Sequence, residues 1–241
     1  MEVSFESPDE NILCDEALFR LAEKGETSEI LRFWESPSVF VVLGRTGSRE
    51  KDCVADTVEA DRIPVLRRCS GGGTVLQGPG CLNFTLVLSK GRDRGLEDIR
   101  KSYGWILERV ITVLARQNIT AVFHPISDLA VAREKGESLK FSGNAQRRGR
   151  KFILHHGTIL RDFDLALISR YLNMPRDRPE YRNDRAHADF VTNIALQRQD
   201  FYRDMQKIFN LPVYSGRLTD SVAAMMRNIR AAHDPVVDNL Y

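Results

Sequence analysis

A run of three glycines, Gly71 to Gly73, places the strongest constraint on how this chain folds. Glycine has no β-carbon, so the backbone there can take positive φ angles and stays open to close approach by a ligand. The stretches on either side, residues 64–68 and 74–76, are typical of short strands. The pattern predicts a loop between two strands, whose main-chain N–H groups can surround an anion such as phosphate.

Two arginines, Arg67 and Arg68, precede this loop and add fixed positive charge. Guanidinium groups donate paired hydrogen bonds to phosphate or carboxylate oxygens. The loop is not a Walker A motif, because no Gly-Lys-Ser/Thr follows it, and no G-x-G-x-x-G opens a helix here. A flexible hairpin loop with solvated arginines and a nucleotide-binding loop both fit the glycines alone.

The remaining pattern predicts strands separated by helices. Ser7, Pro8 and Glu10 predict a capping box at the start of a first helix, which ends at Gly25. Residues 30–34 and 39–43 predict a hairpin around Glu-Ser-Pro-Ser. Further helices are expected near residues 51–60, 96–117, 162–172, 195–209 and 218–229, and further strands near 82–88, 121–123, 128–132, 139–142, 151–154 and 158–160. Residues 174–189 are polar and are expected to form a loop.

This order indicates an α+β fold with a mixed or antiparallel sheet flanked by helices. The 241 residues suffice for a single domain. We expect residues 195–241 to form a short helical C-terminal extension rather than a second full domain.

Composition excludes several classes of function. The net charge of +2 gives no reason to expect nucleic acid or a membrane surface as a partner. No apolar stretch approaches the roughly 18 residues of a membrane helix, and the acidic N-terminus predicts no signal peptide. The four cysteines are widely spaced without a C-x-x-C pair, so we expect reduced thiols and a cytoplasmic location.

Two further segments carry candidate chemistry. In a strand, Lys140 and Ser142 are expected on one face, with Leu139 and Phe141 on the other. A lysine facing phosphate or carboxylate would stabilise developing charge, whereas a solvated edge-strand lysine is the alternative. The adjacent His155 and His156 should face opposite ways, so at most one can enter a given site and a metal pair is disfavoured.

A basic cluster, Arg147, Arg148, Arg150 and Lys151, follows the lysine segment. Such a cluster can bind RNA or an acidic partner, but most often it forms a solvated turn. No aromatic residues alternate with it, so base stacking is not indicated.

Taken together, these segments resemble the lipoate–protein ligase A family, within the wider biotin/lipoate ligase superfamily. The resemblance covers roughly residues 31–194. It rests on five segments in order: Leu31-Arg32-Phe33-Trp34-Glu35-Ser36-Pro37 running into Val42-Leu43-Gly44-Arg45; Arg67 to Leu76 with Gly80-Cys81-Leu82-Asn83-Phe84; Ser127-Asp128-Leu129; Lys140-Phe141-Ser142-Gly143-Asn144-Ala145; and His155-His156-Gly157-Thr158-Ile159-Leu160.

The resemblance implies an ATP-dependent ligase that activates lipoate or octanoate as acyl-AMP and transfers it to a lysine of an acceptor domain. Lys140 would be the catalytic residue, touching both α-phosphate and acyl carbonyl. The implied nucleotide-binding residues are Arg68, Gly73, Thr74, Val75, Leu76 and Lys140. The implied lipoate-binding residues are Trp34, Arg67, Gly72, Lys140, His155 and His156.

The family also implies ATP and Mg²⁺ as cofactors, lipoate as substrate, and Asp128 as a residue linked to the magnesium. The implied partners are lipoyl acceptor domains of 2-oxoacid dehydrogenases or the glycine cleavage H protein, with a separate accessory chain as a further candidate. The sequence departs from the family at Gln77-Gly78, where His-Asp is common, and at Cys81, where asparagine is common.

Two other functions remain open. Octanoyltransferases share this fold and use no ATP, and one branch uses a nucleophilic cysteine before the motif lysine. No cysteine follows Cys81 here, so that branch is disfavoured. A non-catalytic lipoyl-binding subunit is the second alternative, and intact Arg68 and Lys140 argue against it.

Overall fold

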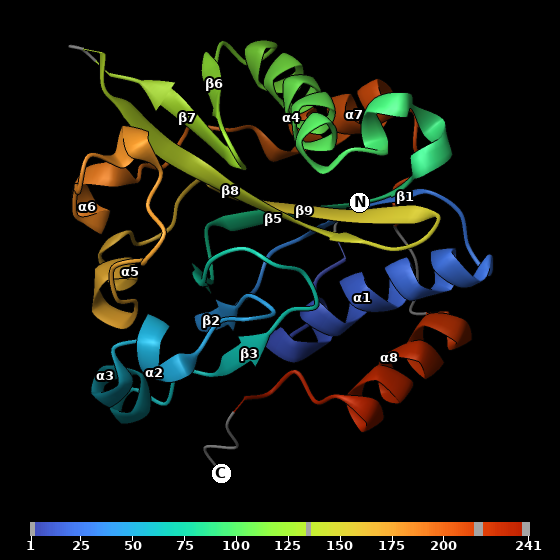
Figure 1. The fold of residues 1–241 in the computed structure, drawn as a ribbon, viewed down its shortest axis with the longest axis horizontal. Coiled ribbons are helices and arrows are strands. Elements are labelled where there is room, and N and C mark those ends of the chain that lie inside the picture. Colours follow the sequence, from blue (N-terminus) through green and yellow to red (C-terminus); the bar gives the residue numbers. More distant parts are fainter. Residues whose placement is uncertain (1–2, 134–135, 215–218, 238–241) are drawn as a thin grey trace.

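A six-stranded antiparallel sheet crosses the middle of the computed structural model, which describes residues 3–133, 136–214 and 219–237 (Figure 1). A three-stranded mixed sheet lies beside it, with β2 parallel to β3 and antiparallel to β4. In spatial order, the large sheet contains β1 (Ile30–Trp34), β5 (Cys81–Ser89), β9 (Phe152–Leu160), β8 (Ser138–Arg148), β7 (Asp128–Ala132) and β6 (Ala121–His124), and the small one β3 (Val65–Arg67), β2 (Phe40–Leu43) and β4 (Val75–Gln77).

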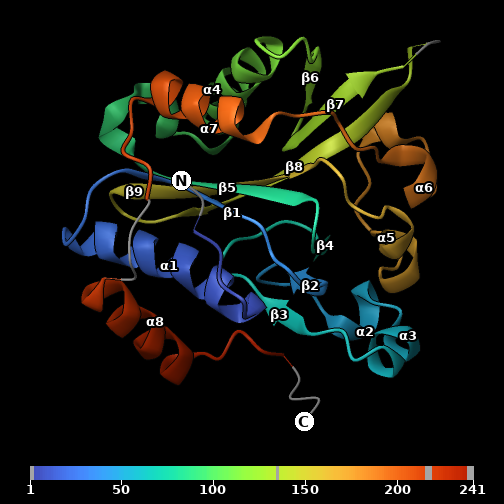
Figure 2. The same ribbon diagram turned by 180° about the vertical axis from the view of Figure 1, so that it is seen from behind.

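Helices cover both faces of the large sheet (Figures 1 and 2). Helices α4 and α7 lie on one face, and α1 and α8 lie on the other, on the same side as the small sheet. The helices are α1 (Pro8–Lys24), α2 (Arg49–Asp52), α3 (Ala55–Ala60), α4 (Ile99–Ala115), α5 (Ala166–Tyr171), α6 (His187–Phe190), α7 (Arg198–Phe209) and α8 (Asp220–Ala232). The architecture confirms the predicted α+β class with flanking helices.

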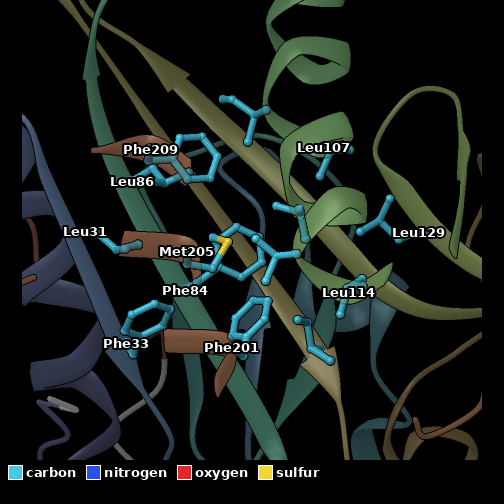
Figure 3. Close-up of a cluster of buried hydrophobic side chains, with 14 of the residues drawn as sticks. Leu31, Phe33, Phe84, Leu86, Leu107, Leu114, Leu129, Phe201, Met205 and Phe209 are labelled. Carbon is cyan, nitrogen blue, oxygen red and sulfur yellow. The ribbon is translucent and has the colours of Figure 1, made fainter. Parts of the chain in front are cut away.

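The main hydrophobic core lies between the large sheet and helices α4 and α7 (Figure 3). Phe84 from β5 meets the ring of Phe201 from α7 at a centroid distance of 6.2 Å. Both side chains are fully buried, and burying one such side chain stabilises the fold by about 1.5–3 kcal/mol. Helix α7 supplies Phe201, Met205 and Phe209 to this core.

Alternation along β5 separates the core from a polar face. Leu82, Phe84 and Leu86 belong to the core under α4 and α7, whereas Asn83 and Thr85 face the side of α1 and the small sheet. Polar side chains therefore gather on that second face, where the glycine loop also lies.

The predicted hairpin of residues 30–34 and 39–43 is wrong. Strand β1 pairs with β5 of the large sheet, and β2 pairs with β3 and β4 of the small one. All four residues of β2 are buried, as expected of a central strand with a partner on each side. The intervening turn carries the chain from one sheet to the other, with the Ser36 hydroxyl donating to the carbonyl of Ser38.

Two local expectations also fail. The break expected near Gly157 is absent, because β9 runs without interruption from Phe152 to Leu160. A β-carbon at Gly157 would lie 2.0 Å from Asn144 Oδ1, so this glycine allows close packing rather than a turn. Ser7 does occupy the N-cap of α1, but its side chain makes no capping bond and its hydroxyl donates to Asp9.

Several helix ends agree with the sequence. Gly25 caps α1 in the left-handed conformation at φ 79°, and its N–H donates to the carbonyls of Ala22 and Leu21. Helix α8 begins at Asp220, and Leu218, where this helix was expected to start, lies outside the described residues. Among the helices that the structure describes, none combines the length and the apolar character that crossing a membrane requires.

Candidate functional site

The glycine loop lies directly over β8 of the large sheet. Gly72 takes φ +87°, and a β-carbon placed on it would sit 3.7 Å from the β-carbon of Ala145. A β-carbon on Gly44 would lie only 2.0 Å from the Gly72 carbonyl oxygen, so the loop after β2 packs tightly against the glycine loop as well. Glycine is therefore needed at both contacting positions.

Side chains tie the loop to β9 at both of its ends. The Ser70 hydroxyl lies 2.6 Å from Nε2 of His156. At the far end, Gln77 Nε2 donates to Thr158 Oγ1 at 2.7 Å, and Asn83 links these two side chains through bonds of 3.0 and 2.6 Å. His156 and Thr158 are two residues apart on one strand, so they present their side chains to the same face.

Arg68 holds the loop from inside. Its guanidinium donates to the carbonyls of Gly71 and Gly73 at 2.6 and 2.8 Å, and its Nε donates to the Ser70 hydroxyl at 3.0 Å. Burial lowers the pKa of Arg68 to about 10, which leaves it charged near neutrality. Within the described part of the chain, the N–H groups of Gly72 and Gly73 donate to no protein acceptor, so they remain able to bind a ligand.

Lys140 lies on the same face of β8 as the loop. Its ammonium pairs with Asp128 Oδ1 at 2.8 Å, and a β-carbon on Gly143 would lie 3.2 Å from Nζ. Gly143 and Ala145 are same-face neighbours on the strand, about 7 Å apart. Since the ammonium lies over Gly143 and Gly72 over Ala145, the lysine and the glycine loop share one site.

A β-bulge sets this direction of Lys140. Leu129 pairs with Ser142 while the next residue, Ala130, pairs with Lys140, so Phe141 is the extra residue of the bulge. The expectation that Lys140 and Ser142 share a face is therefore wrong. Ser142 lies opposite Leu129 and is buried, whereas Phe141 faces the core as expected.

The two adjacent histidines face opposite sides of the sheet, as the alternation predicts. His155 is fully buried on the side of α4, where it receives a hydrogen bond from Gln146 and contacts the ring of Tyr103. Burial lowers its pKa to about 3, so it is neutral at ordinary pH. Of the two, only His156 faces the glycine loop.

A buried carboxylate behind His156 was not anticipated from the sequence. Asp15 of α1 lies 3.6 Å from His156 Nδ1, 2.6 Å from the Arg32 guanidinium, and accepts a bond from Thr85 at 2.8 Å. Burial alone would raise the pKa of Asp15, but the charge of Arg32, the nearby His156 and the bond from Thr85 lower it overall. Two sequence patterns could have indicated this pair. Asp15 is a charged residue on an otherwise apolar helix face, and Arg32 is a charged residue within an otherwise apolar strand.

Other expected site residues lie in several surroundings. Trp34 is buried at the end of β1 in an apolar cluster, and among the described residues its Nε1 has no hydrogen-bond partner. Arg67 donates to the carbonyls of Gly44 and Gly47. Thr74 donates to Asp52 Oδ2 at 2.7 Å, which fixes the loop against α2.

Asp128 is the residue of this site that the sequence linked to magnesium. Within residues 3–133, 136–214 and 219–237, no three His, Cys, Asp or Glu side chains gather as metal ligands. Asp128 is the carboxylate beside Lys140, and Tyr181 already donates to its second oxygen at 2.9 Å. Magnesium is commonly bound through one or two carboxylates and substrate phosphates, so a magnesium ion here would rely mainly on the phosphates of ATP.

The basic cluster lies at the end of β8 and in the β8–β9 turn. It borders a surface hollow of about 590 Å³ between α1, α8 and that turn. Arg148 donates to the carbonyls of Leu96 and Glu97, and Arg147 lies 3.5 Å from Glu16. These two arginines thus have partners within the fold.

One family matches most of the residues that form this fold. The family described as "Lipoyl protein ligase A/B catalytic domain" matches residues 7–209, and the chain belongs to it. A probable lipoate-protein ligase A of Mycoplasma pneumoniae is 30% identical over 168 residues, which is 70% of this chain and 47% of that protein. A lipoate-protein ligase A of Blochmanniella pennsylvanica is 33% identical over 165 residues, covering 68% of this chain and 45% of that protein.

The chain thus spans about half the length of the curated relatives it matches. Solved structures share its fold. A bi-partite lipoate protein ligase of Thermoplasma acidophilum matches with a TM-score of 0.78 at 22% identity, over 95% of this chain and 89% of that one. A lipoate-protein ligase A bound with ATP gives 0.77 at 22% identity, over 95% and 92% of the two chains.

Proposed function

We propose that this chain activates lipoate with ATP and attaches the lipoyl group to a lysine of an acceptor domain. The proposal rests on one observation: the Lys140 ammonium and Gly72 of the glycine loop lie over neighbouring positions of β8, Gly143 and Ala145. Membership of the ligase family supports it. Further support comes from structures of the same fold described as bound with ATP and with lipoic acid.

In the first step, a lipoate carboxylate oxygen attacks the α-phosphorus of ATP. The bond from that phosphorus to the bridging oxygen breaks, and pyrophosphate leaves with the bonding electrons. Negative charge builds on the phosphate oxygens during this step. The loop N–H groups of Gly72, Gly73 and Thr74 and the ammonium of Lys140 would stabilise it, because they are fixed before reaction begins.

In the second step, the ε-amine of the acceptor lysine attacks the acyl carbon. An amide bond forms, the bond from the acyl carbon to the AMP oxygen breaks, and the amine gives up a proton. Charge passes through the carbonyl oxygen, which Lys140 would also face. To stabilise the charge on the phosphate in the first step and on the carbonyl oxygen in the second, the Lys140 ammonium must leave its ion pair with Asp128 or share it. The partly exposed Lys140 side chain allows this movement.

The surrounding residues have supporting roles in this proposal. Arg68 shapes the loop because its guanidinium donates to the carbonyls of Gly71 and Gly73. If Arg68 also contacted the nucleotide directly, the same N–H groups would be shared between the loop and the nucleotide. His156, Trp34, Arg67 and Gly72 would border the lipoyl chain. A magnesium ion bound to ATP would neutralise its phosphates, with Asp128, beside Lys140, as a candidate carboxylate.

Acceptors in this proposal are lipoyl domains of 2-oxoacid dehydrogenases or the glycine cleavage H protein. A Thermoplasma ligase of the same fold is described together with its E2 lipoyl domain and as bi-partite. We propose that residues 1–241 act as a single catalytic domain, and a separate accessory chain is a candidate partner.

A cysteine-dependent acyl transferase fits the structure less well. All four cysteines are free thiols, and burial raises the pKa of Cys69 to about 12 and that of Cys81 further. A thiol with a raised pKa forms little nucleophilic thiolate at neutral pH. A non-catalytic lipoyl-binding subunit would also bind the ligands, so only a measurement of turnover distinguishes it from a ligase.

The deciding experiment incubates the chain with lipoate, magnesium and an isolated lipoyl domain, with and without ATP. We expect lipoate-dependent pyrophosphate release and, by mass spectrometry, a lipoyl adduct on the acceptor only when ATP is present. Acyl transfer from an octanoyl carrier protein without ATP would instead identify a transferase. Binding of lipoate or ATP with no pyrophosphate release, even with an accessory domain added, would indicate a non-catalytic subunit.

A further inference from the structure

Tyr181 reaches the candidate site from a part of the chain where no site residue was expected. It lies in a short 3-10 turn, Glu180–Arg182, between α5 and α6, within the segment expected to be a polar loop. Its hydroxyl donates to Asp128 Oδ2 at 2.9 Å, while the other carboxylate oxygen of Asp128 pairs with Lys140 at 2.8 Å. Tyr181, Asp128 and Lys140 thus form a continuous chain of contacts, from the segment between α5 and α6 to the Lys140 ammonium.

The ring of Tyr181 is held rigidly. It stacks on the imidazole of His124 at the end of β6, with a centroid distance of 3.9 Å and an interplanar angle of 7°. The backbone is fixed as well, because the Arg185 guanidinium donates to the carbonyl of Tyr181 at 2.7 Å and to that of Ser138 on β8 at 3.1 Å. The hydroxyl is therefore placed relative to both β6 and β8.

The orientation of the Asp128 carboxylate, which lies between Tyr181 and Lys140, depends on the hydrogen bond from Tyr181. Asp128 is only 8% exposed, and it sits at the first residue of β7 beside the turn from β6. A carboxylate with one partner can rotate about its last torsion, whereas one fixed at each oxygen has a single orientation.

We propose that Tyr181 is a positioning residue for Lys140, acting through the Asp128 carboxylate that both side chains share. The proposal deepens the proposed function, because it places the loop between α5 and α6 in the machinery that directs the ammonium toward the reacting phosphate. Tyr181 itself is not a catalytic residue. Its loss should lower the rate of adenylate formation more than the affinity for ATP.

The test compares Tyr181→Phe, Asp128→Asn and the double variant by lipoate-dependent pyrophosphate release. Tyr181→Phe keeps the stacked ring and removes only the hydroxyl. We expect its kcat to fall about tenfold, the scale of one lost hydrogen bond to a charged group, with the KM for ATP within about twofold of wild type. The double variant should be no slower than Asp128→Asn alone, since both changes remove the same restraint.

Tyr171→Phe is the matched control. Tyr171 also donates to a carboxylate at 2.9 Å, that of Asp61, but this pair lies at the ends of α5 and α3, outside the site. It should keep wild-type kcat and KM. A wild-type kcat for Tyr181→Phe, or effects of Tyr181→Phe and Asp128→Asn that simply multiply in the double variant, would overturn the proposal.

A second measurement does not require turnover. Labelling of Lys140 by a small amine-acylating reagent, quantified by peptide mass spectrometry, reports how tightly the ammonium is held. We expect labelling to rise severalfold in Tyr181→Phe and in Asp128→Asn, and not in Tyr171→Phe. Unchanged labelling in Tyr181→Phe would refute the positioning role. If the wild-type chain released no pyrophosphate but labelling still rose in the two variants, only the ligase assignment would be refuted.

Discussion

The hydroxyl of Ser70 lies 2.6 Å from Nε2 of His156, and this contact fastens the start of the glycine loop to the central strand β9. Asp15 stands behind the imidazole and Arg68 behind the hydroxyl, so the contact belongs to a buried network rather than to an exposed loop. The loop is thereby held over the same face of the sheet that carries Lys140.

Ser70→Ala should weaken ATP binding. The change leaves the Arg68 Nε and the His156 ring without their shared partner, which costs about 1–3 kcal/mol and loosens the loop. We expect the KM for ATP in pyrophosphate release to rise about tenfold. Ser36→Ala is the matched control, because Ser36 is equally buried and hydrogen-bonded but lies in the β1–β2 turn. Equal KM values for wild type and Ser70→Ala would contradict the role of the contact.

Gly157→Ala should be strongly destabilising although it lies in a regular strand. The added β-carbon would meet Asn144 Oδ1 at 2.0 Å and the Phe84 ring at 2.6 Å, so the free energy of unfolding should fall by about 3 kcal/mol. Gly104→Ala in α4 meets nothing within 4 Å and should gain up to about 1 kcal/mol from helix propensity. Urea unfolding of the two variants checks this, and a similar stability for both would count against the packing at Gly157.

His155 should make the fold less stable as the pH falls. Its pKa is lowered by burial to about 3, against about 6.5 in an unfolded chain. Between these values the unfolded state binds more protons, so stability is lost as the pH falls below about 6.5, by up to about 1.4 kcal/mol per pH unit. His155→Gln, measured by urea unfolding from pH 7 to pH 5, should show a shallower loss than wild type.

The exposed His233→Gln serves as control for that series and should keep the wild-type slope. Parallel pH dependences for wild type and His155→Gln would show that the buried imidazole does not contribute.

Lys140→Ala should abolish lipoate-dependent pyrophosphate release, by at least about a hundredfold, because a preorganised positive charge at the reacting centre is lost. The side chain is 28% exposed, so the circular dichroism spectrum and the melting temperature should stay close to wild type. Lys151→Ala, on the exposed β8–β9 turn, should release pyrophosphate normally. Release at the wild-type rate by Lys140→Ala would remove this residue from the mechanism.

Much of the fold could be predicted from local pattern. The alternation along β5 and the apolar periodicity of α4 are strong local features, and both elements lie close to where they were expected. The pairing of β1 could not be predicted in this way. Its partner β5 lies about fifty residues further along the chain, and a short turn after Trp34 resembles a hairpin whether or not the strands pair.

The site was predictable in outline but not in its details. The family motifs brought Lys140 and the glycine loop together, yet the direction of Lys140 depends on a bulge at Phe141, and one extra residue reverses every later side chain. Asp15 pairs with Arg32, which is 17 residues away in the sequence, and Tyr181 bonds to Asp128, which is 53 residues away. Such pairs exist only once the chain has folded.

A crystal structure of the chain with a non-hydrolysable lipoyl-adenylate analogue tests the central claim most directly. We predict that the phosphate mimic lies within hydrogen-bond distance of the Gly72–Thr74 backbone N–H groups and of Lys140 Nζ at once. A bound analogue whose phosphate mimic contacts the loop while Lys140 stays paired with Asp128 and out of reach, or one bound away from the loop, would contradict it.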